Sequence, residues 1–169
     1  MNPPPTVINF AYGSNLLVAR IRERVPSAQP LAVARLHGYR LAWHKRGRDG
    51  SGKCDIVATG EPLDCVWGVA YAIDARERPL LDAAEGLGHG YEHHPVRVLA
   101  ATGTMDAFAY RAIDIDTSLA PFDWYHGLVT AGALAHGLPA GYRARLAAQP
   151  VMADPDHARV AHHRRLIGR

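Results

Sequence analysis

The alternation of apolar and polar residues predicts several short strands along the chain. Between residues 7 and 12, Ile8, Phe10 and Tyr12 fall on one face, as in a strand with one buried side. Further strands are expected at 31–43 (bent at Gly38), 53–59, 65–73, 95–101 and 106–113. We expect 53–59 to pair with 65–73 through the turn at 60–64, and 95–101 to pair with 106–113 as a hairpin.

Apolar residues at helical spacing predict helices between and after these strands. Residues 17–25 indicate a first helix, capped by Ser14 or Asn15 and stopped by Pro26. A second helix ends where glycines recur at 86, 88 and 90, which places Glu85 in its last turn. Further helices are expected at 124–136, after the break at 137–139, and in the C-terminal tail.

The order of these elements indicates an α+β fold, because strands occur in runs and there is no regular βαβ alternation. We expect a compact mixed β-sheet or small β-barrel with flanking helices. The 169 residues match the length of one ordinary domain. That domain spans 1–169, with a flexible N-terminus at 1–5 and a peripheral C-terminal tail at 151–169.

Charge and composition favour a cytoplasmic protein that binds a small molecule. The 19 basic and 16 acidic residues give a formal net charge of +3, too small and too scattered to favour nucleic acid as the partner. The N-terminus does not resemble a signal peptide, and we expect no membrane-spanning segment. Cys54 and Cys65, expected in adjacent strands, are interpreted as reduced thiols rather than a disulfide.

The segment 9–17 combines an apolar strand, a glycine turn and the expected start of a helix. The first turn of a helix has unpaired backbone N–H groups and a partial positive charge. The backbone from Gly13 to Leu16 therefore predicts a site for a carboxylate or a developing oxyanion.

Glu85 is the acid that we expect to move protons. A carboxylate in the last turn of a helix faces the negative end of the helix dipole, which disfavours the charged form. Apolar surroundings, with Leu81, Leu87 and Tyr91 as neighbours, would act in the same direction. The alternative is a solvated surface glutamate, which is the commoner environment for this residue type.

Two blocks, in this order, resemble the γ-glutamylcyclotransferase family of the AIG2-like superfamily. Phe10 to Leu16 (FAYGSNL) resembles the opening motif of that family. Leu81 to Gly86 (LDAAEG), with Tyr91 beyond it, resembles the family's catalytic-glutamate block. Shorter similarities at 26–28, 34–36, 66–69, 125, 132–133 and 137–142 extend the resemblance over residues 6–150.

The resemblance implies an enzyme that needs neither metal nor cofactor. It would cyclise the γ-glutamyl group of a γ-glutamyl amino acid or amine to 5-oxoproline and release the free amine. Glu85 would be the catalytic proton shuttle. The residues expected to bind substrate are Tyr12, Gly13, Ser14, Asn15, Leu16, Tyr91 and Tyr125, although each tyrosine could equally be a core aromatic. The leaving group stays open between an amino acid, the cysteinyl-glycine of glutathione, a polyamine and an acylated antibiotic.

Other hypotheses fit parts of the sequence. A catalytically silent module of the same fold could bind a γ-glutamyl group or carboxylate, and the basic tail around Arg164 could bind nucleic acid weakly. His89 and His93 have a metal-ligand spacing only on a helix, and the glycines around them argue against a helix there. A two-fold homodimer is the commonest oligomer and the one that we expect.

The arginines of the first predicted helix have a simpler interpretation. Arg20, Arg22 and Arg24 are expected on its solvent side, where they would confer solubility. The loop at 86–90 and the histidines that follow it, His93 and His94, are candidates for setting leaving-group specificity at the rim of the site.

Overall fold

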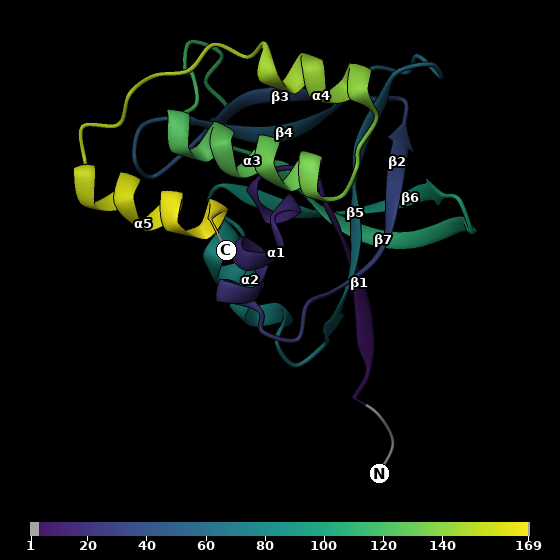
Figure 1. Ribbon diagram of the computed structural model, residues 1–169. Coiled ribbons are helices and arrows are strands. Elements are labelled where there is room, and N and C mark those ends of the chain that lie inside the picture. The colour runs from purple at the N-terminus through teal and green to yellow at the C-terminus, as the bar shows by residue number, and fades with distance from the viewer. Residues whose placement is uncertain (1–3, 169) are drawn as a thin grey trace.

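A closed five-stranded barrel forms the centre of this computed structural model, which describes residues 4–168 (Figure 1). Around the barrel the strand order is β1-β5-β2-β6-β7. The bounds are β1 Thr6–Ala11, β2 Gln29–His37, β5 Cys65–Asp74, β6 Tyr91–Ala100 and β7 Gly103–Ala112. Neighbouring strands are antiparallel except β1 and β7, which close the barrel in parallel. The predicted α+β fold with a small barrel is confirmed.

The closure of the barrel depends on Asn9 of β1. Its backbone is in register with Phe108 of β7, and its side-chain Nδ2 donates a hydrogen bond to the Phe108 carbonyl at 3.2 Å. Asn9 is only 1% exposed, so this bond satisfies a buried amide. The β6–β7 pair is the predicted hairpin, and its register runs from Tyr91 opposite Ala112 to Ala100 opposite Gly103.

A second, two-stranded sheet consists of β3 Tyr39–Arg46 and β4 Gly52–Ala58. Gly38, at φ 77°, turns the chain from β2 into β3, at the bend predicted from the sequence. The predicted pairing of 53–59 with 65–73 is wrong, because β4 pairs with β3 and β5 lies between β1 and β2. The buried character of β5 on both faces suits a central strand.

The two cysteines are consequently not on adjacent strands. Cys54 is buried on β4 and Cys65 is partly exposed on β5, and both are free thiols, as expected.

The helices cover one side of the barrel (Figure 1). They are the 3₁₀ turn η1 Ser14–Leu16, α1 Val18–Arg24, α2 Arg78–Glu85, α3 Asp123–Ala135, α4 Ala140–Ala147 and α5 His157–Ile167. Helix α3 packs against both η1 and α5. A Cβ added at Gly132 of α3 would lie 2.5 Å from the Leu17 nitrogen, so α3 and the η1 turn approach each other backbone to backbone.

The first helix does not begin as predicted. Neither Ser14 nor Asn15 caps it: they form the η1 turn, and α1 starts at Val18 with Leu17 in extended conformation as its N-cap. The Asn15 side chain instead bonds to Glu85 and Arg24, which are distant in sequence. The Asn15 side-chain amide therefore bonds to these distant residues instead of capping the helix.

The second helix ends as predicted. Glu85 is the last residue of α2, and Gly86 follows in the left-handed conformation at φ 70°. The helix begins at Arg78, with Pro79 in its first turn.

The tail forms the predicted helix, α5, whose N-cap Asp156 accepts a hydrogen bond from the backbone of Arg159. The end of α5 lies beside α1 (Figure 1). No described helix is long and apolar enough to cross a membrane. The N-terminal segment 1–5 was expected to be flexible, and its residues 1–3 lie outside the described part of the chain. Within that segment, the Pro5 carbonyl accepts a hydrogen bond from the backbone N–H of Ala75.

Candidate active site

A narrow inner pocket lies where the end of β1, the η1 turn and the end of α2 meet. Its free volume is about 30 Å³. Seven of the eight predicted site residues line it: Tyr12, Gly13, Ser14, Asn15, Glu85, Tyr91 and Tyr125. Asn9, Phe10, Ala11, Cys54 and Tyr110 complete the lining. The structure thus brings together residues that lie up to 116 positions apart in the sequence, from Asn9 to Tyr125.

The floor of this pocket is the η1 turn. The turn is closed by a hydrogen bond from the Leu16 N–H to the Gly13 carbonyl at 3.0 Å, and Leu17 bonds in the same way to Ser14. Within residues 4–168, no acceptor is bonded to the backbone N–H groups of Ser14 or Asn15. Both residues are buried and line the pocket, so these two N–H groups are available to an anion.

Leu16 is the predicted site residue that does not reach the pocket. It is fully buried in the core, its N–H is used within the turn, and its carbonyl accepts a hydrogen bond from the Tyr71 hydroxyl at 3.0 Å. Its expected contact with substrate is not provided by this geometry. Of the predicted cradle from Gly13 to Leu16, Leu16 is therefore the residue whose N–H is already bonded within the turn.

Glu85 is held in place by two donors on one of its oxygens. Asn15 Nδ2 lies 2.8 Å and Arg24 Nη1 lies 2.5 Å from Oε1, and the Glu85 side chain is 13% exposed. Among the described residues, none bonds to Oε2. The surroundings of Glu85 are mixed rather than apolar: Leu81 and Tyr91 are buried, but a guanidinium lies beside the carboxylate and Leu87 is exposed.

Three buried tyrosines build the walls. Tyr91 donates a hydrogen bond to the Cys54 carbonyl at 2.6 Å, and Tyr125 accepts one from the Cys54 N–H at 3.0 Å. Tyr12 donates to the carbonyl of Tyr110. Burial is the main reason that the pKa of each of the three phenols lies well above its ordinary value. They are therefore neutral at physiological pH and act as fixed hydrogen-bonding groups.

Cys54 joins two of these tyrosines but is not poised as a nucleophile. Burial raises the pKa of its thiol far above the ordinary value, so the reactive thiolate form is disfavoured. Its main contribution is through the backbone, since its N–H and carbonyl fix Tyr125 and Tyr91 on either side of the pocket. Neither Cys54 nor Tyr110 was predicted as a site residue, because each comes from a strand far away in sequence.

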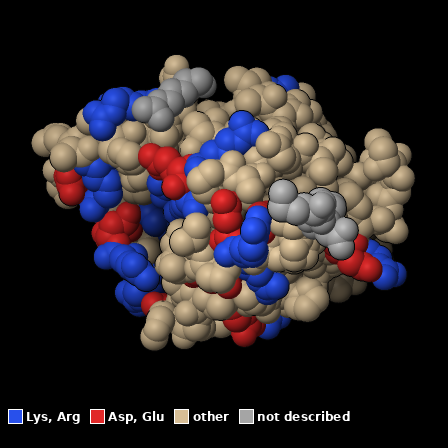
Figure 2. Space-filling view, turned by 90° about the horizontal axis from the view of Figure 1, so that it is seen from below, with Lys and Arg blue, Asp and Glu red and all other residues tan. Residues whose placement is uncertain are grey.

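A larger outer cavity, with about 370 Å³ of free volume, adjoins the inner pocket. Ser14, Glu85, Tyr91 and Tyr125 line both spaces, so they mark the junction. The outer cavity has six basic residues in its lining: Arg20, Arg24, Lys45, Arg48, Lys53 and Arg159. Seen from below, basic and acidic side chains are interleaved around a hollow on one side of the molecule (Figure 2).

Helix α1 contributes two of these basic residues. Arg20 and Arg24 were expected on the solvent side, but their side chains are only 13% and 17% exposed. Their four-residue spacing, which places both on one face of a helix, was the available signal for a shared environment. The prediction failed because the buried face of this short helix is partly polar.

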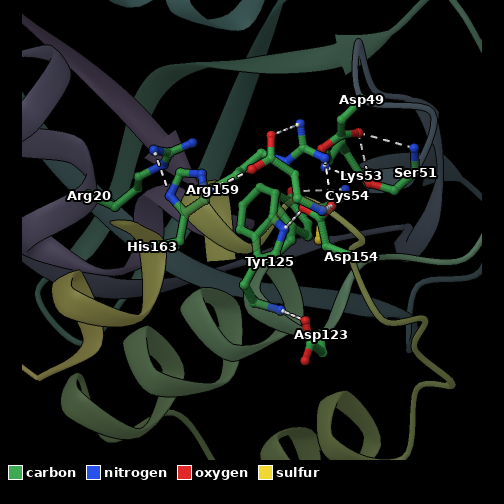
Figure 3. Close-up of polar contacts among 12 residues, drawn as sticks. Arg20, Asp49, Ser51, Lys53, Cys54, Asp123, Tyr125, Asp154, Arg159 and His163 are labelled. Carbon is green, nitrogen blue, oxygen red and sulfur yellow. Dashed lines mark hydrogen bonds and ion pairs between the residues drawn. The ribbon is translucent and has the colours of Figure 1, made fainter. Parts of the chain in front are cut away.

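The far wall of the outer cavity is a connected polar network (Figure 3). Lys53 Nζ lies 2.7 Å from Asp49 and sits over the rings of Trp124 and Tyr125, 4.7 Å from each centroid. Arg159 of α5 bonds to Asp154 at 2.6 Å. The tail predicted to be peripheral therefore supplies part of the wall.

The histidines do not form a metal site in the described residues. His93 Nε2 is 2.6 Å from Asp82 Oδ1, and Tyr110 donates to the same oxygen. His94 is paired with the hydroxyl of Tyr39. No group of three or more metal-ligating side chains comes together within residues 4–168.

Similarity to known proteins identifies the family. A sequence model of the AIG2-like family matches residues 65–146. Gamma-glutamylcyclotransferase from Homo sapiens is 34% identical over 143 residues, which cover 82% of this chain and 76% of that protein. The protein of the same name from Bos taurus is 33% identical over 142 residues, covering 81% and 75%.

The fold agrees with these sequence matches. A solved structure named gamma-glutamyl cyclotransferase superposes with a TM-score of 0.84 at 26% identity, covering 97% of this chain and 99% of that one. The predicted resemblance, made from the opening motif and the glutamate block, is thereby confirmed. The chain belongs to the γ-glutamylcyclotransferase family of enzymes.

Proposed function

We propose that this protein converts a γ-glutamyl amino acid or amine into 5-oxoproline and the free amine. The observation that carries the proposal is the position of Glu85, which lies at the junction of the inner pocket and the outer cavity with one carboxylate oxygen unbonded among the described residues. A group at this point can reach both the attacking and the leaving nitrogen of a substrate that spans the two spaces.

The reaction is an intramolecular aminolysis. The α-amine of the γ-glutamyl group loses a proton to Glu85 Oε2 and attacks its own γ-carbonyl carbon, forming a five-membered ring. The bond between that carbon and the leaving nitrogen then breaks, and Glu85 returns the proton to the leaving nitrogen. Because the nucleophile belongs to the substrate, proximity within the bound molecule replaces a covalent enzyme intermediate.

The inner pocket offers hydrogen-bond donors for two negative charges: the α-carboxylate of the substrate and the oxyanion of the tetrahedral intermediate. In the proposal, the backbone N–H groups of Ser14 and Asn15 bind the α-carboxylate, which enters the narrow pocket. The Tyr125 hydroxyl accepts from Cys54, so its own hydrogen remains to donate to the oxyanion of the tetrahedral intermediate. The rings of Tyr12 and Tyr91 exclude water from the ring-closing atoms.

The test is release of 5-oxoproline, measured by mass spectrometry, from a mixed library of γ-glutamyl amino acids and amines. Wild type is expected to produce it, and Glu85→Gln is expected to lose at least about a hundredfold in kcat, because the amide cannot accept a proton. Glu61→Gln is the matched control, since Glu61 is exposed on the turn between β4 and β5 and lines neither cavity. It should retain wild-type turnover.

Two results would contradict the proposal. Full turnover by Glu85→Gln would remove Glu85 from the chemistry. Calorimetry that detects binding of γ-glutamyl compounds by a wild-type protein that forms no product would favour a silent binding module of the same fold.

A further inference from the structure

The basic residues of the outer cavity outnumber its acids. Six basic residues line it, against the two acids Asp49 and Glu85. Some of these cations are neutralised within the protein: Arg24 by Glu85, Lys53 by Asp49 and Arg159 by Asp154. The remaining cations of the lining are the candidates for binding a negatively charged ligand.

Lys45 of β3 is one of them. It is only 8% exposed, yet its Nζ has no hydrogen bond or ion pair with any of residues 4–168. The ammonium lies 4.8 Å from the centre of the Tyr91 ring, which is itself a wall of the site. Burial is the main reason that the pKa of Lys45 lies below its ordinary value, and the nearby charges of Glu85 and Asp114 only partly offset it.

The path of Lys45 into the cavity depends on a glycine. A Cβ added at Gly90 would lie 2.6 Å from both Cε and Nζ of Lys45, so the lysine passes directly over this backbone. Gly90 belongs to the loop that follows Glu85, so the lysine reaches the cavity next to the proposed proton shuttle. An ammonium on a mostly buried side chain that forms no direct ion pair is unfavourable, and an anion bound in the cavity would relieve it.

Arg20 of α1 is the second under-neutralised cation. Its closest carboxylate, Glu23, is 3.5 Å away, and its contact with His163 is equally long. Its Nε is buried without a hydrogen-bond partner among the described residues. Figure 3 shows Arg20 beside His163, at the opposite end of the polar network from Lys53 and Asp49. Burial, followed by the neighbouring Arg24, lowers the pKa of Arg20 to about 10.

Lys45 and Arg20 come from different elements and line the same cavity, so they offer two separate places for negative charge. Resting on the proposed function, we propose that the outer cavity receives a leaving group with two carboxylates. The preferred substrate is then a γ-glutamyl conjugate of an acidic amino acid, glutamate or aspartate. The volume of about 370 Å³ leaves room for such a group. A polyamine would bring further positive charge beside Lys45, Arg20 and Arg48.

The experiment compares kcat/KM for γ-glutamyl-glutamate and γ-glutamyl-glutamine, which have nearly the same shape and differ by one charge. A hydrogen-bonded ion pair in a largely buried site predicts a preference of about tenfold or more for the acidic conjugate. Higher salt concentration should reduce this preference. A γ-glutamyl polyamine should be the poorest substrate of the series.

Variants at Lys45 test whether the cavity causes the preference. Lys45→Met should bring the ratio of the two kcat/KM values close to one, and Lys45→Arg should keep most of it. Arg97→Met is the control, because Arg97 is an exposed residue of the β6–β7 hairpin whose ion pair with Asp106 is also exposed. Its ratio should equal that of wild type.

The possible failures are distinguishable. If γ-glutamyl-glutamine is cyclised as well as γ-glutamyl-glutamate, and Glu85→Gln still abolishes turnover, the acidic leaving group is refuted and the proposed function stands. An unchanged ratio in a folded Lys45→Met variant would refute the role of Lys45. If no γ-glutamyl compound yields 5-oxoproline, the proposed function fails and this inference fails with it.

Discussion

Arg24→Met tests whether the ion pair at the junction positions the carboxylate of Glu85, the proposed proton shuttle. The guanidinium supplies one of two hydrogen bonds to Glu85 Oε1 and also donates to Asn15 Oδ1 at 3.0 Å. Methionine is similarly long and flexible but cannot donate. Glu85 would keep only the bond from Asn15, and the position of Oε2, the proposed proton acceptor, would be less restricted.

The size of the effect follows from the contacts that are lost. A hydrogen bond to a charged group contributes about 1.5–3 kcal/mol. The two side chains are 17% and 13% exposed, so partial screening favours the lower end, about 1.5–2 kcal/mol. If all of this loss falls on the transition state, kcat decreases about ten- to thirtyfold. Asn15 remains, so the loss should be smaller than that of Glu85→Gln.

The assay is steady-state release of 5-oxoproline, with kcat and KM measured separately. Arg24→Lys keeps the charge and should restore part of kcat. Arg22→Met is the matched control on the same helix, because the Arg22 guanidinium bonds to the Ala28 carbonyl and lines neither cavity.

One result would refute this reasoning: a folded Arg24→Met enzyme with wild-type kcat. An equal loss in Arg22→Met would show that the effect comes from the helix as a whole rather than from the ion pair.

Three further perturbations concern the support of the site. Tyr125→Phe leaves the buried Cys54 N–H without its acceptor, so the free energy of unfolding should fall by about 1–3 kcal/mol in urea denaturation and turnover should fall with it. Gly132→Ala forces a methyl group against the η1 turn and should cost about 1–3 kcal/mol or more, measured in the same way. His163 is stacked on Trp124, and burial, followed by Arg20, lowers its pKa to about 3. In the unfolded chain this histidine binds a proton near pH 6.5, whereas in the folded protein it stays neutral, so acidification favours the unfolded state. The melting temperature of wild type should therefore decrease between pH 7.5 and pH 5 by more than that of His163→Phe.

Each of these perturbations has a control elsewhere in the chain. Tyr39→Phe removes the hydroxyl of a partly buried tyrosine outside both cavities, and its turnover should remain that of wild type. Gly141→Ala adds a methyl group to α4 where the space is open, so it should be neutral or slightly stabilising. His157→Phe changes an exposed histidine at the start of α5 and should leave the pH dependence unchanged. Equal stability of Gly132→Ala and Gly141→Ala would contradict the close packing of α3 on the η1 turn.

The sequence by itself determined the features that depend on neighbouring residues. The glycine after Glu85 ends α2 because only a residue tolerant of positive φ continues the chain there without strain. The β6–β7 hairpin follows from two alternating runs separated by a short turn. The two family-like blocks likewise lie within continuous segments, so Glu85 and the residues from Tyr12 to Asn15 could be proposed as site residues from the order of amino acids alone.

Only the tertiary structure decided what these residues meet. Glu85 is 70 residues from Asn15 and 61 from Arg24, and nothing in their local sequence specifies that they touch. From the local pattern we expected Asn15 to cap a helix and Arg24 to be exposed to solvent. We also expected the strands β4 and β5 to pair, because they are consecutive in the sequence. The structure shows none of these three arrangements. Barrel closure replaced those local choices with long-range ones, because burying the apolar faces of β1, β5 and β7 together stabilises the fold more than any single cap or turn. The outer cavity, whose basic residues come from α1, β3, the loop before β4, β4 itself and α5, exists only once that packing is complete.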